Sequence, residues 1–294
     1  MRLANEKPDE FCTTDVRIPP LNARFAQTHV EGLGPGILQP PRKLDRKKHD
    51  MTRLNGKTAV ITGGATGIGL AAARRFVAEG AFVFIFGRRR DALDAAVAEL
   101  GPNARAVQGS IAVEADLDRL YAAVKAERGT LDIVVANAGT GSMVKLGEIT
   151  AAHIDETFDI NVKGTILTVQ KALPLMGKGG SIILTGSSAG TTGAPAMTTY
   201  SASKAAVRNL ARTWVEDLKG TGIRVNVLSP GAIATELATE ALGEEGLKVY
   251  GAMTGFQRMG DPAELGSAAA FLASDDSSFM TGSELAVDGG LAQI

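Results

Sequence analysis

The sequence predicts an α/β fold in which one parallel sheet of about seven strands carries helices on both faces. From Thr58 onward, short apolar runs alternate with alanine-rich stretches of helical length. The apolar runs are nearly continuous, which is typical of strands buried on both faces of a parallel sheet. Strand and helix alternation at this spacing forms right-handed βαβ units. Such units build a single doubly wound, Rossmann-like sheet that binds ligands at the carboxyl ends of its strands.

Each predicted element is bounded by local signals. The first apolar run enters a glycine-rich turn, and Ala81–Phe86 is short and wholly apolar. Gly101-Pro102 ends the second helix, because proline cannot continue it. The predicted strands are Thr58–Thr62, Ala81–Phe86, Ala104–Val107, Leu131–Ala136, Ser181–Thr185, Ile223–Leu228 and Glu284–Val287. The predicted helices are Gly69–Glu79, Asp91–Leu100, Ala115–Glu127, Asp155–Leu175, Tyr200–Leu218 and Pro262–Ala273.

Residues 1–50 differ from the rest of the chain. They hold six of the eleven prolines and nine Lys/Arg against seven Asp/Glu, and they show no apolar periodicity. We interpret residues 1–50 as an irregular arm and residues 51–294 as one Rossmann-type domain. The basic run Arg42–Lys48 is interpreted as a solvated linker rather than a nucleic-acid or localisation signal. An alternative is that natural translation starts at Met51.

Composition narrows the class of protein. The chain has 294 residues, of which 45% are apolar and 21% charged, with a net charge of −1. This balance gives no reason to expect a nucleic-acid or membrane partner. A single cysteine, the absence of a secretory pattern and the absence of a long apolar run favour a cytoplasmic protein. The three histidines are not at metal-ligand spacing, so we expect no metal site, and we interpret His153 as an exposed helix residue.

The first strand leads directly into a glycine-rich turn and then a helix. The turn reads Thr62-Gly63-Gly64-Ala65-Thr66-Gly67-Ile68-Gly69. Glycines allow the backbone to approach a pyrophosphate, and the free N–H groups of a helix N-terminus attract phosphate. This strand–turn–helix context predicts a dinucleotide site.

Arginines follow the second strand, in the run Phe86-Gly87-Arg88-Arg89-Arg90. NAD sites of this fold place an acidic residue here, whereas NADP sites place a cation for the 2′-phosphate. No acidic residue occurs before Asp91, and a guanidinium can bind a phosphate with two hydrogen bonds. We therefore predict NADP(H) as the preferred cofactor, with Arg88 as first contact and Arg89 as second, and NAD(H) as a possible one.

Tyr200 and Lys204 are four residues apart at the start of a predicted helix, so both side chains lie on one helical face. A nearby ammonium group stabilises phenolate and lowers the pKa of tyrosine toward the working range. Ser187 follows the predicted strand Ser181–Thr185, where a hydroxyl can hydrogen-bond a substrate oxygen. Ser188 is the alternative to Ser187.

These motifs together resemble the branch of the short-chain dehydrogenase/reductase family whose members have about 250 residues. The resemblance rests on Gly67-Ile68-Gly69, Asn137-Ala138-Gly139, Asn161-Val162, Ser187, Tyr200-x-x-x-Lys204 and Pro230-Gly231, in order and spacing, and covers residues 54–290. Two positions depart from the family pattern. Ser110-Ile111 stands where an aspartate often contacts the adenine, and Gly186 stands where a serine often precedes the catalytic one.

The resemblance implies a role for each matching residue. Tyr200 is expected to be the general acid/base, Lys204 its pKa tuner and ribose ligand, Ser187 the group that polarises the substrate oxygen, and Asn161 the holder of a relay water. Asn137 is expected to brace the central strand beside the cofactor. The remaining expected cofactor contacts are Gly63, Thr66, Gly67, Ile68, Gly69, Ser110, Ile111, Ala138, Gly139, Pro230, Gly231, Ile233 and Thr235.

The resulting functional prediction is an NADP(H)-dependent oxidoreductase that transfers hydride to or from a small carbonyl compound or secondary alcohol. The alternatives are an NAD-dependent sugar-type dehydrogenase, a 3-oxoacyl-carrier-protein reductase, and a non-catalytic protein that senses dinucleotides. Segments 140–146 and 236–258 are expected to shape the substrate pocket, the latter as a mobile lid. The family resemblance also implies a homotetramer, or otherwise a homodimer.

Overall fold

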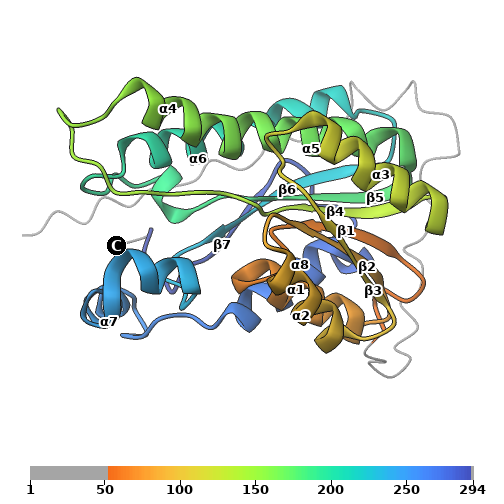
Figure 1. The fold of residues 1–294 in the computed structure, drawn as a ribbon, viewed down its shortest axis with the longest axis horizontal. Coiled ribbons are helices and arrows are strands. Elements are labelled where there is room, and N and C mark those ends of the chain that lie inside the picture. The colour runs from red at the N-terminus through yellow and green to blue at the C-terminus, as the bar shows by residue number, and fades with distance from the viewer. Residues whose placement is uncertain (1–51, 293–294) are drawn as a thin grey trace, which may run out of the picture. The chain divides into compact units, whose positions relative to one another are not determined.

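The computed structural model describes residues 52–292, in which seven strands form one sheet in the order β3-β2-β1-β4-β5-β6-β7 (Figure 1). Every pairing between neighbouring strands is parallel. The strands are β1 (Thr58–Thr62), β2 (Phe82–Gly87), β3 (Ala104–Gln108), β4 (Leu131–Ala136), β5 (Met176–Thr185), β6 (Arg224–Pro230) and β7 (Glu284–Val287). The predicted doubly wound fold is confirmed. The arm predicted for residues 1–50 lies outside the described residues.

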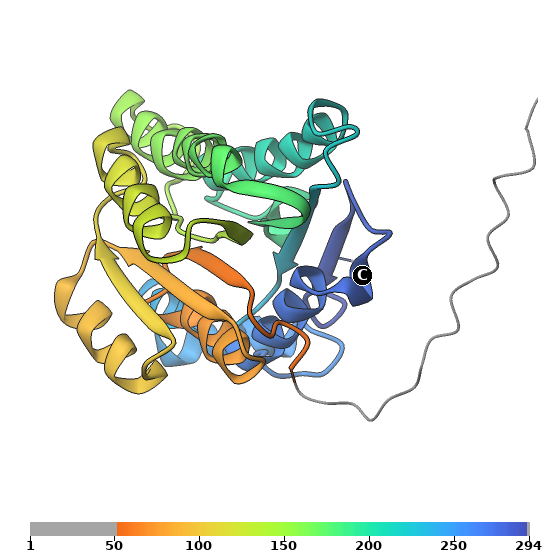
Figure 2. The same cartoon turned by 90° about the vertical axis from the view of Figure 1, so that its right-hand side faces the viewer.

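Helices cover both faces of the sheet (Figure 2). The α-helices are α1 (Gly67–Ala78), α2 (Arg90–Leu100), α3 (Glu114–Arg128), α4 (Ala151–Phe158), α5 (Thr165–Ala172), α6 (Thr198–Asp217), α7 (Glu236–Ala252) and α8 (Pro262–Ala273). Helices α1, α2 and α8 pack on one face, and α3, α5 and α6 pack on the other. Side chains of β1 alternate between the two apolar cores, with Ala59 and Ile61 on the α1 side and Val60 on the α3 side.

The strand order reverses between β1 and β4. From β1 the chain moves outward through β2 to β3, then returns to β4 and moves the other way to β7. Carboxyl ends of β1 and β4 therefore lie side by side at the switch point of the topology. Ligands of open α/β sheets bind in the crevice at this point.

The segment predicted as one helix, Asp155–Leu175, is divided in the structure. It contains α4, a π-helix η1 (Asp159–Gly164), α5 and a 3₁₀ turn η2 (Leu173–Leu175). Pro174 ends the helical run, and β5 begins directly at Met176 rather than at the predicted Ser181. The early residues of β5 are glycine-rich and lack the apolar signal on which the strand prediction depended.

Candidate active site

Four loops meet at the carboxyl ends of the strands and carry more than half of the predicted site residues. They follow β1 (the glycine-rich turn), β4 (from Asn137), β5 (from Gly186) and β6 (from Gly231). The amino-terminal part of α6 adds Tyr200 and Lys204. The fold thus brings together residues that are up to about 170 positions apart in the sequence.

Lys204 is a buried cation, with 6% of its surface exposed. Its Nζ donates a 2.8 Å hydrogen bond to the carbonyl oxygen of Thr185 and lies 5.7 Å from the centre of the Tyr200 ring. Burial lowers the pKa of Lys204 to about 8, because the charged form loses hydration. Among residues 52–292, no carboxylate forms an ion pair with it. The ammonium group therefore lies near the phenol ring with no carboxylate of the described residues to balance its charge.

Tyr200 has a pKa above its ordinary value in this structure. Burial raises the pKa, a hydrogen bond with the Ser187 side chain lowers it, and the nearby Tyr250 raises it. The sequence led us to expect a lowered pKa through Lys204. The difference has a physical reason, since burial of the phenol disfavours the charged phenolate and is the largest influence on this pKa.

The two serines after β5 face different partners. Ser187 interacts with Tyr200, and its Oγ also accepts a 3.2 Å hydrogen bond from the Ala189 backbone, which begins a 3₁₀ turn. Ser188 is 5% exposed, and its side chain hydrogen-bonds the phenol of Tyr250 in α7. Burial raises the pKa of Tyr250, and this hydrogen bond partly offsets the rise. Sequence reasoning missed Tyr250, because nothing in the lid segment marked one residue as directed toward the site.

Asn161 lies at the centre of the π-helix η1 and is 1% exposed. Its Oδ1 accepts a 2.8 Å hydrogen bond from the Thr140 backbone, and its Nδ2 donates to Thr140 O and Ser203 Oγ, both at 2.9 Å. Ser203 in turn donates to the carbonyl oxygen of Tyr200. Asn161 thereby ties the loop after β4 to the amino-terminal part of α6. Such π-helical insertions are frequent at functional sites.

Asn137 joins the strands at the switch point. Its backbone N–H donates a 3.0 Å hydrogen bond to Thr62 Oγ1, and its Nδ2 donates to the carbonyl oxygens of Thr62 and Gly63 at 3.1 and 3.3 Å. Ala138 N also donates to Thr62 Oγ1. The glycine that follows is needed for space, since a Cβ at Gly139 would lie 3.2 Å from Asn161 Oδ1 and 3.6 Å from Lys204 Nζ. This bracing fixes the floor of the crevice.

The glycine-rich turn forms a cradle suited to a pyrophosphate. Gly63 and Gly67 have φ values of +64° and +53°, and a Cβ at Gly69 would lie 2.1 Å from Gly63 O. Thr66 precedes α1 without capping it, so the first N–H groups of the helix are free of a side-chain acceptor. Ile68 packs against the core below. The turn thus has the donors and the open backbone that a dinucleotide needs.

Arg88 and Arg89 lie exposed beyond β2, beside this cradle. Arg89 Nη2 is 3.5 Å from Thr66 Oγ1 and 3.3 Å from Glu236 Oε2 at the start of α7. Ser110 binds its own loop, since its N–H donates to Asp116 and its Oγ accepts from Ala112 N. Ile111 is 5% exposed and packs on η1 at Gly164. Ser110 and Ile111 therefore serve loop structure in addition to any contact with adenine.

The loop after β6 forms the wall opposite the glycine-rich turn. Gly231 has no room for a Cβ, which would lie 2.6 Å from Asp288. Ile233 is buried and pairs with Gly260, while Thr235 caps α7 by accepting from Ala238 N. A Cβ on Gly67 would contact Thr235 Cγ2 at 3.4 Å. The two walls of the crevice therefore approach each other at this point. Pro230, the last residue of β6, is fully enclosed.

His153 does not lie exposed on its helix, as its sequence context had suggested. It is half-buried, and its Nε2 is 2.7 Å from Oγ1 of Thr199, the residue before Tyr200. No sequence signal indicated this contact, because α4 and α6 are distant in the chain. Across residues 52–292, no group of three or more His, Cys, Asp or Glu side chains is placed to hold a metal ion. No helix in the same range has the length and apolar character needed to cross a membrane.

Comparison with known proteins agrees with this geometry. Residues 63–292 match the family model described as enoyl-(acyl carrier protein) reductase. Oxidoreductase asL5 of Sarocladium schorii is 68% identical over 82% of this chain and 98% of its own length. The 3-oxoacyl-[acyl-carrier-protein] reductase FabG of Thermotoga maritima is 36% identical over 81% of this chain and 99% of its own length.

Two further similarities extend the comparison. A 2,5-dichloro-2,5-cyclohexadiene-1,4-diol dehydrogenase of Sphingobium indicum is 38% identical over 83% of this chain and the whole of its own. A solved structure of a short chain dehydrogenase/reductase family protein superposes with a TM-score of 0.74 at 37% identity, over 82% of this chain and all of that one. The chain therefore belongs to the short-chain dehydrogenase/reductase family and is a nicotinamide-dependent oxidoreductase that acts on alcohol or carbonyl groups.

Proposed function

We propose that this enzyme uses NADP(H) and that Tyr200 exchanges a proton with the oxygen of a carbonyl or secondary-alcohol substrate. The observation that carries the proposal is the buried Lys204, whose Nζ lies 5.7 Å from the Tyr200 ring and has no carboxylate partner in the described part of the chain. Burying an ammonium group without such a partner is unfavourable. A catalytic role for Lys204 explains why the fold retains it.

Each residue of the site has its own role in the proposed reaction. A bound nicotinamide supplies hydride to the substrate carbon in reduction, or accepts it in oxidation. In reduction, the Tyr200 hydroxyl donates its proton to the substrate oxygen as the C=O bond becomes C–O, and Lys204 stabilises the phenolate that remains. Ser187 donates a hydrogen bond to the same oxygen while negative charge develops there. Asn161 holds the relay that returns a proton to Tyr200.

The proposed preference for NADP(H) rests on the charges around the end of β2. Arg88 and Arg89 are both exposed there, and no carboxylate occupies the position that would bind a ribose 2′-hydroxyl. Arg89 already contacts Thr66 of the glycine-rich turn, on the side where phosphates would lie. The ion pair between Arg89 and Glu236 leaves Arg88 as the first 2′-phosphate ligand.

Fluorescence titration with NADPH and with NADH, followed by a panel of ketones and alcohols, tests both parts. We expect NADPH to bind more tightly, Arg88→Ala to reduce that advantage by about tenfold, and Tyr200→Phe to lower kcat by about 10³-fold. Arg90→Ala is the matched control, because Arg90 is adjacent but pairs with Asp94 within α2. NADH binding as tight as NADPH binding would refute the cofactor proposal. Turnover retained in Tyr200→Phe would refute the catalytic one.

We also propose where the protein is located and how it assembles. We expect a cytoplasmic homotetramer, as the family resemblance implies. A largely apolar hollow along the end of α4, η1 and α5 supports assembly through this helical face; it is lined by Phe158, Val162, Ile166 and Leu167 together with the ion pair of Asp159 and Lys163. Sedimentation of the wild type and of Ile166→Asp would test it, with dissociation expected in the variant.

A further inference from the structure

His153 makes two side-chain contacts that its own helix does not need. Its backbone N–H is already capped by Thr150 Oγ1 at 3.2 Å, at the start of α4. The imidazole reaches away from α4, with Nε2 2.7 Å from Thr199 Oγ1 and Nδ1 3.3 Å from Ser142 Oγ. Both ring nitrogens are therefore engaged by hydroxyl groups of other segments.

These two contacts involve the chain neighbour of Tyr200 and the loop that packs on its ring. Thr199 is the residue before Tyr200 in α6, and it is 6% exposed. Ser142 follows Gly141, which lies directly against the tyrosine ring, since a Cβ there would be 2.9 Å from Cδ2 and 3.1 Å from Cε2 of Tyr200. His153 thus joins the backbone that carries the ring to the loop that packs on it.

The chemistry of imidazole suits this bridge. In its neutral form one ring nitrogen donates a hydrogen bond and the other accepts one. A hydroxyl group can do either, so a neutral His153 satisfies Thr199 and Ser142 at the same time in either tautomer. No acidic partner or metal ion is required for the contacts to form.

Other bonds hold the two ends of the loop that His153 bridges. Thr140, at the beginning, is bound through its backbone to Asn161. Val144, near the end, donates a 2.8 Å backbone hydrogen bond to Ala196 O, and Ala196 has a strained φ of +61°. The middle of the loop, where Gly141 packs on Tyr200, depends on the contact between Ser142 and His153.

We propose that His153 is a positioning residue that holds the Tyr200 ring in its reacting place by joining the loop at residues 140–144 to the start of α6. The inference rests on the proposed role of Tyr200 as the proton-exchanging group. Because small displacements of a reacting group reduce rates strongly, loss of this bridge lowers kcat. The glycine-rich turn and Arg88 lie elsewhere in the crevice, so the affinity for the cofactor does not change.

The first test compares His153→Leu, His153→Gln and the control Glu156→Ala, which removes an exposed side chain from the same helix. We expect His153→Leu to lower kcat by about tenfold or more, with NADPH affinity within about twofold of wild type. The melting temperature should fall only modestly, because the buried Thr199 hydroxyl loses its partner. Gln can donate and accept, so His153→Gln recovers most of the rate. Glu156→Ala keeps the wild-type rate.

The second test is a double-mutant cycle with Thr199→Val, which removes only the hydroxyl group. If His153 acts through Thr199, the double variant His153→Leu/Thr199→Val loses no more activity than the worse single variant. Multiplicative losses, or a wild-type kcat in His153→Leu, would overturn the proposal. A fall in melting temperature and NADPH affinity parallel to kcat would also overturn it, because it would indicate a general structural role.

Two results separate this inference from the proposed function. An inactive Tyr200→Phe together with a fully active His153→Leu refutes the positioning role alone. An active Tyr200→Phe refutes the proposed role of Tyr200 and with it this inference. If His153→Leu does not fold, Ser142→Ala and Thr199→Val each remove one partner hydroxyl, and an unchanged kcat in both overturns the bridge.

Discussion

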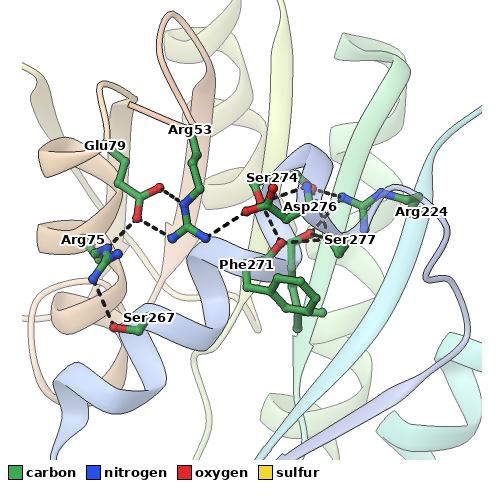
Figure 3. A network of polar contacts seen from close by, with 10 residues as sticks. Arg53, Arg75, Glu79, Arg224, Ser267, Phe271, Ser274, Asp276 and Ser277 are labelled. Atoms are coloured by element: carbon green, nitrogen blue, oxygen red, sulfur yellow. Dashed lines mark hydrogen bonds and ion pairs between the residues drawn. The ribbon is translucent and has the colours of Figure 1, made fainter. Parts of the chain in front are cut away.

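Two buried charged residues, one near the amino ends of the strands and one near their carboxyl ends, differ in how completely they are paired. Glu79 lies at the end of α1, near the amino ends of β1 and β2, and its side chain is 2% exposed. It accepts hydrogen bonds from Arg53 Nη2 at 2.5 Å and Nε at 2.8 Å, and from Arg75 Nε at 2.5 Å (Figure 3). Lys204 lies at the carboxyl ends of the strands, and within residues 52–292 its Nζ hydrogen-bonds a single carbonyl oxygen.

The partners of Glu79 are themselves bound. Arg75 also donates to Ser267 of α8, and Arg53 reaches Asp276 beyond that helix (Figure 3). Burial alone raises the pKa of Glu79, but the hydrogen bonds from Arg53 and Arg75 outweigh it and the pKa is lowered. Glu79 is thus fully paired, whereas Lys204, for which we propose a catalytic role, has no carboxylate partner among residues 52–292. Substitutions at the two sites should therefore separate stability from activity.

The largest effect is expected from Lys204→Met, which keeps the aliphatic stem and removes the charge. Activity should fall by about 10³-fold, because the phenolate of Tyr200 loses its stabilising cation. Stability near pH 7 should rise by about 1–3 kcal/mol, since a folded-state pKa of about 8 against 10.5 in the unfolded chain makes the protonated lysine unfavourable when folded.

The sign of this effect can be checked by pH. A lowered lysine pKa means that the penalty is fully present below about pH 8 and disappears as the pH rises toward 10.5. Denaturant unfolding of both proteins between pH 7 and 10 should therefore show the advantage of Lys204→Met decreasing. A variant that is less stable than wild type at pH 7 would contradict the comparison.

A smaller effect, on stability alone, is expected from Glu79→Gln. The amide cannot pair with both Arg53 and Arg75, so the free energy of unfolding should fall by about 2–4 kcal/mol, while kcat of the folded protein stays unchanged. Glu99→Gln is the control. Glu99 pairs with Arg74 on the exposed surface, where the loss should be below about 0.5 kcal/mol. Equal losses of unfolding free energy in Glu79→Gln and Glu99→Gln would show that burial of the ion pair does not determine its contribution to stability.

The smallest effect concerns an exposed carboxylate that is paired like Glu79. Hydrogen bonds from Arg258 and from the Asp261 backbone lower the pKa of Glu264 to about 2. A lowered pKa contributes stability above the unfolded value of 4.5, and that contribution is lost as the pH falls toward 2. The melting temperature of wild type should exceed that of Glu264→Gln at pH 7, and the difference should shrink toward pH 3. A constant difference would rule out the charge as its source.

The sheet was predicted well from the sequence, and Tyr200 and Lys204 could be proposed from it, because both inferences depend on local patterns. Buried parallel strands appear as apolar runs, and Tyr200 and Lys204 are one helical turn apart. The π-helix around Asn161 could not be predicted, because a single π-helical turn changes the apolar periodicity too little, and the partners of Asn161, Thr140 and Ser203, come from other segments.

The contacts of His153 and Tyr250 escaped prediction for the same reason. The apolar periodicity of α4 does not depend on His153, and that of α7 does not depend on Tyr250. His153 contacts Thr199, and Tyr250 contacts Ser188, only once the chain has folded. The pairing of Arg89 with Glu236 joins the end of β2 to α7 across 147 positions. Tertiary contacts between polar residues leave no periodic signal in a single sequence.

Gly186 places a constraint on how this active site can change. A side chain at this position would put its Cβ 2.4 Å from Ser229 Oγ and 2.6 Å from Val227 Cγ1, and Ser229 is itself bonded to Glu284 of β7. Any residue with a Cβ at this position therefore requires both Ser229 and Val227 to shift. In evolutionary terms, position 186 is epistatic with positions 227 and 229, because the effect of Gly186→Ser depends on which side chains those two positions carry.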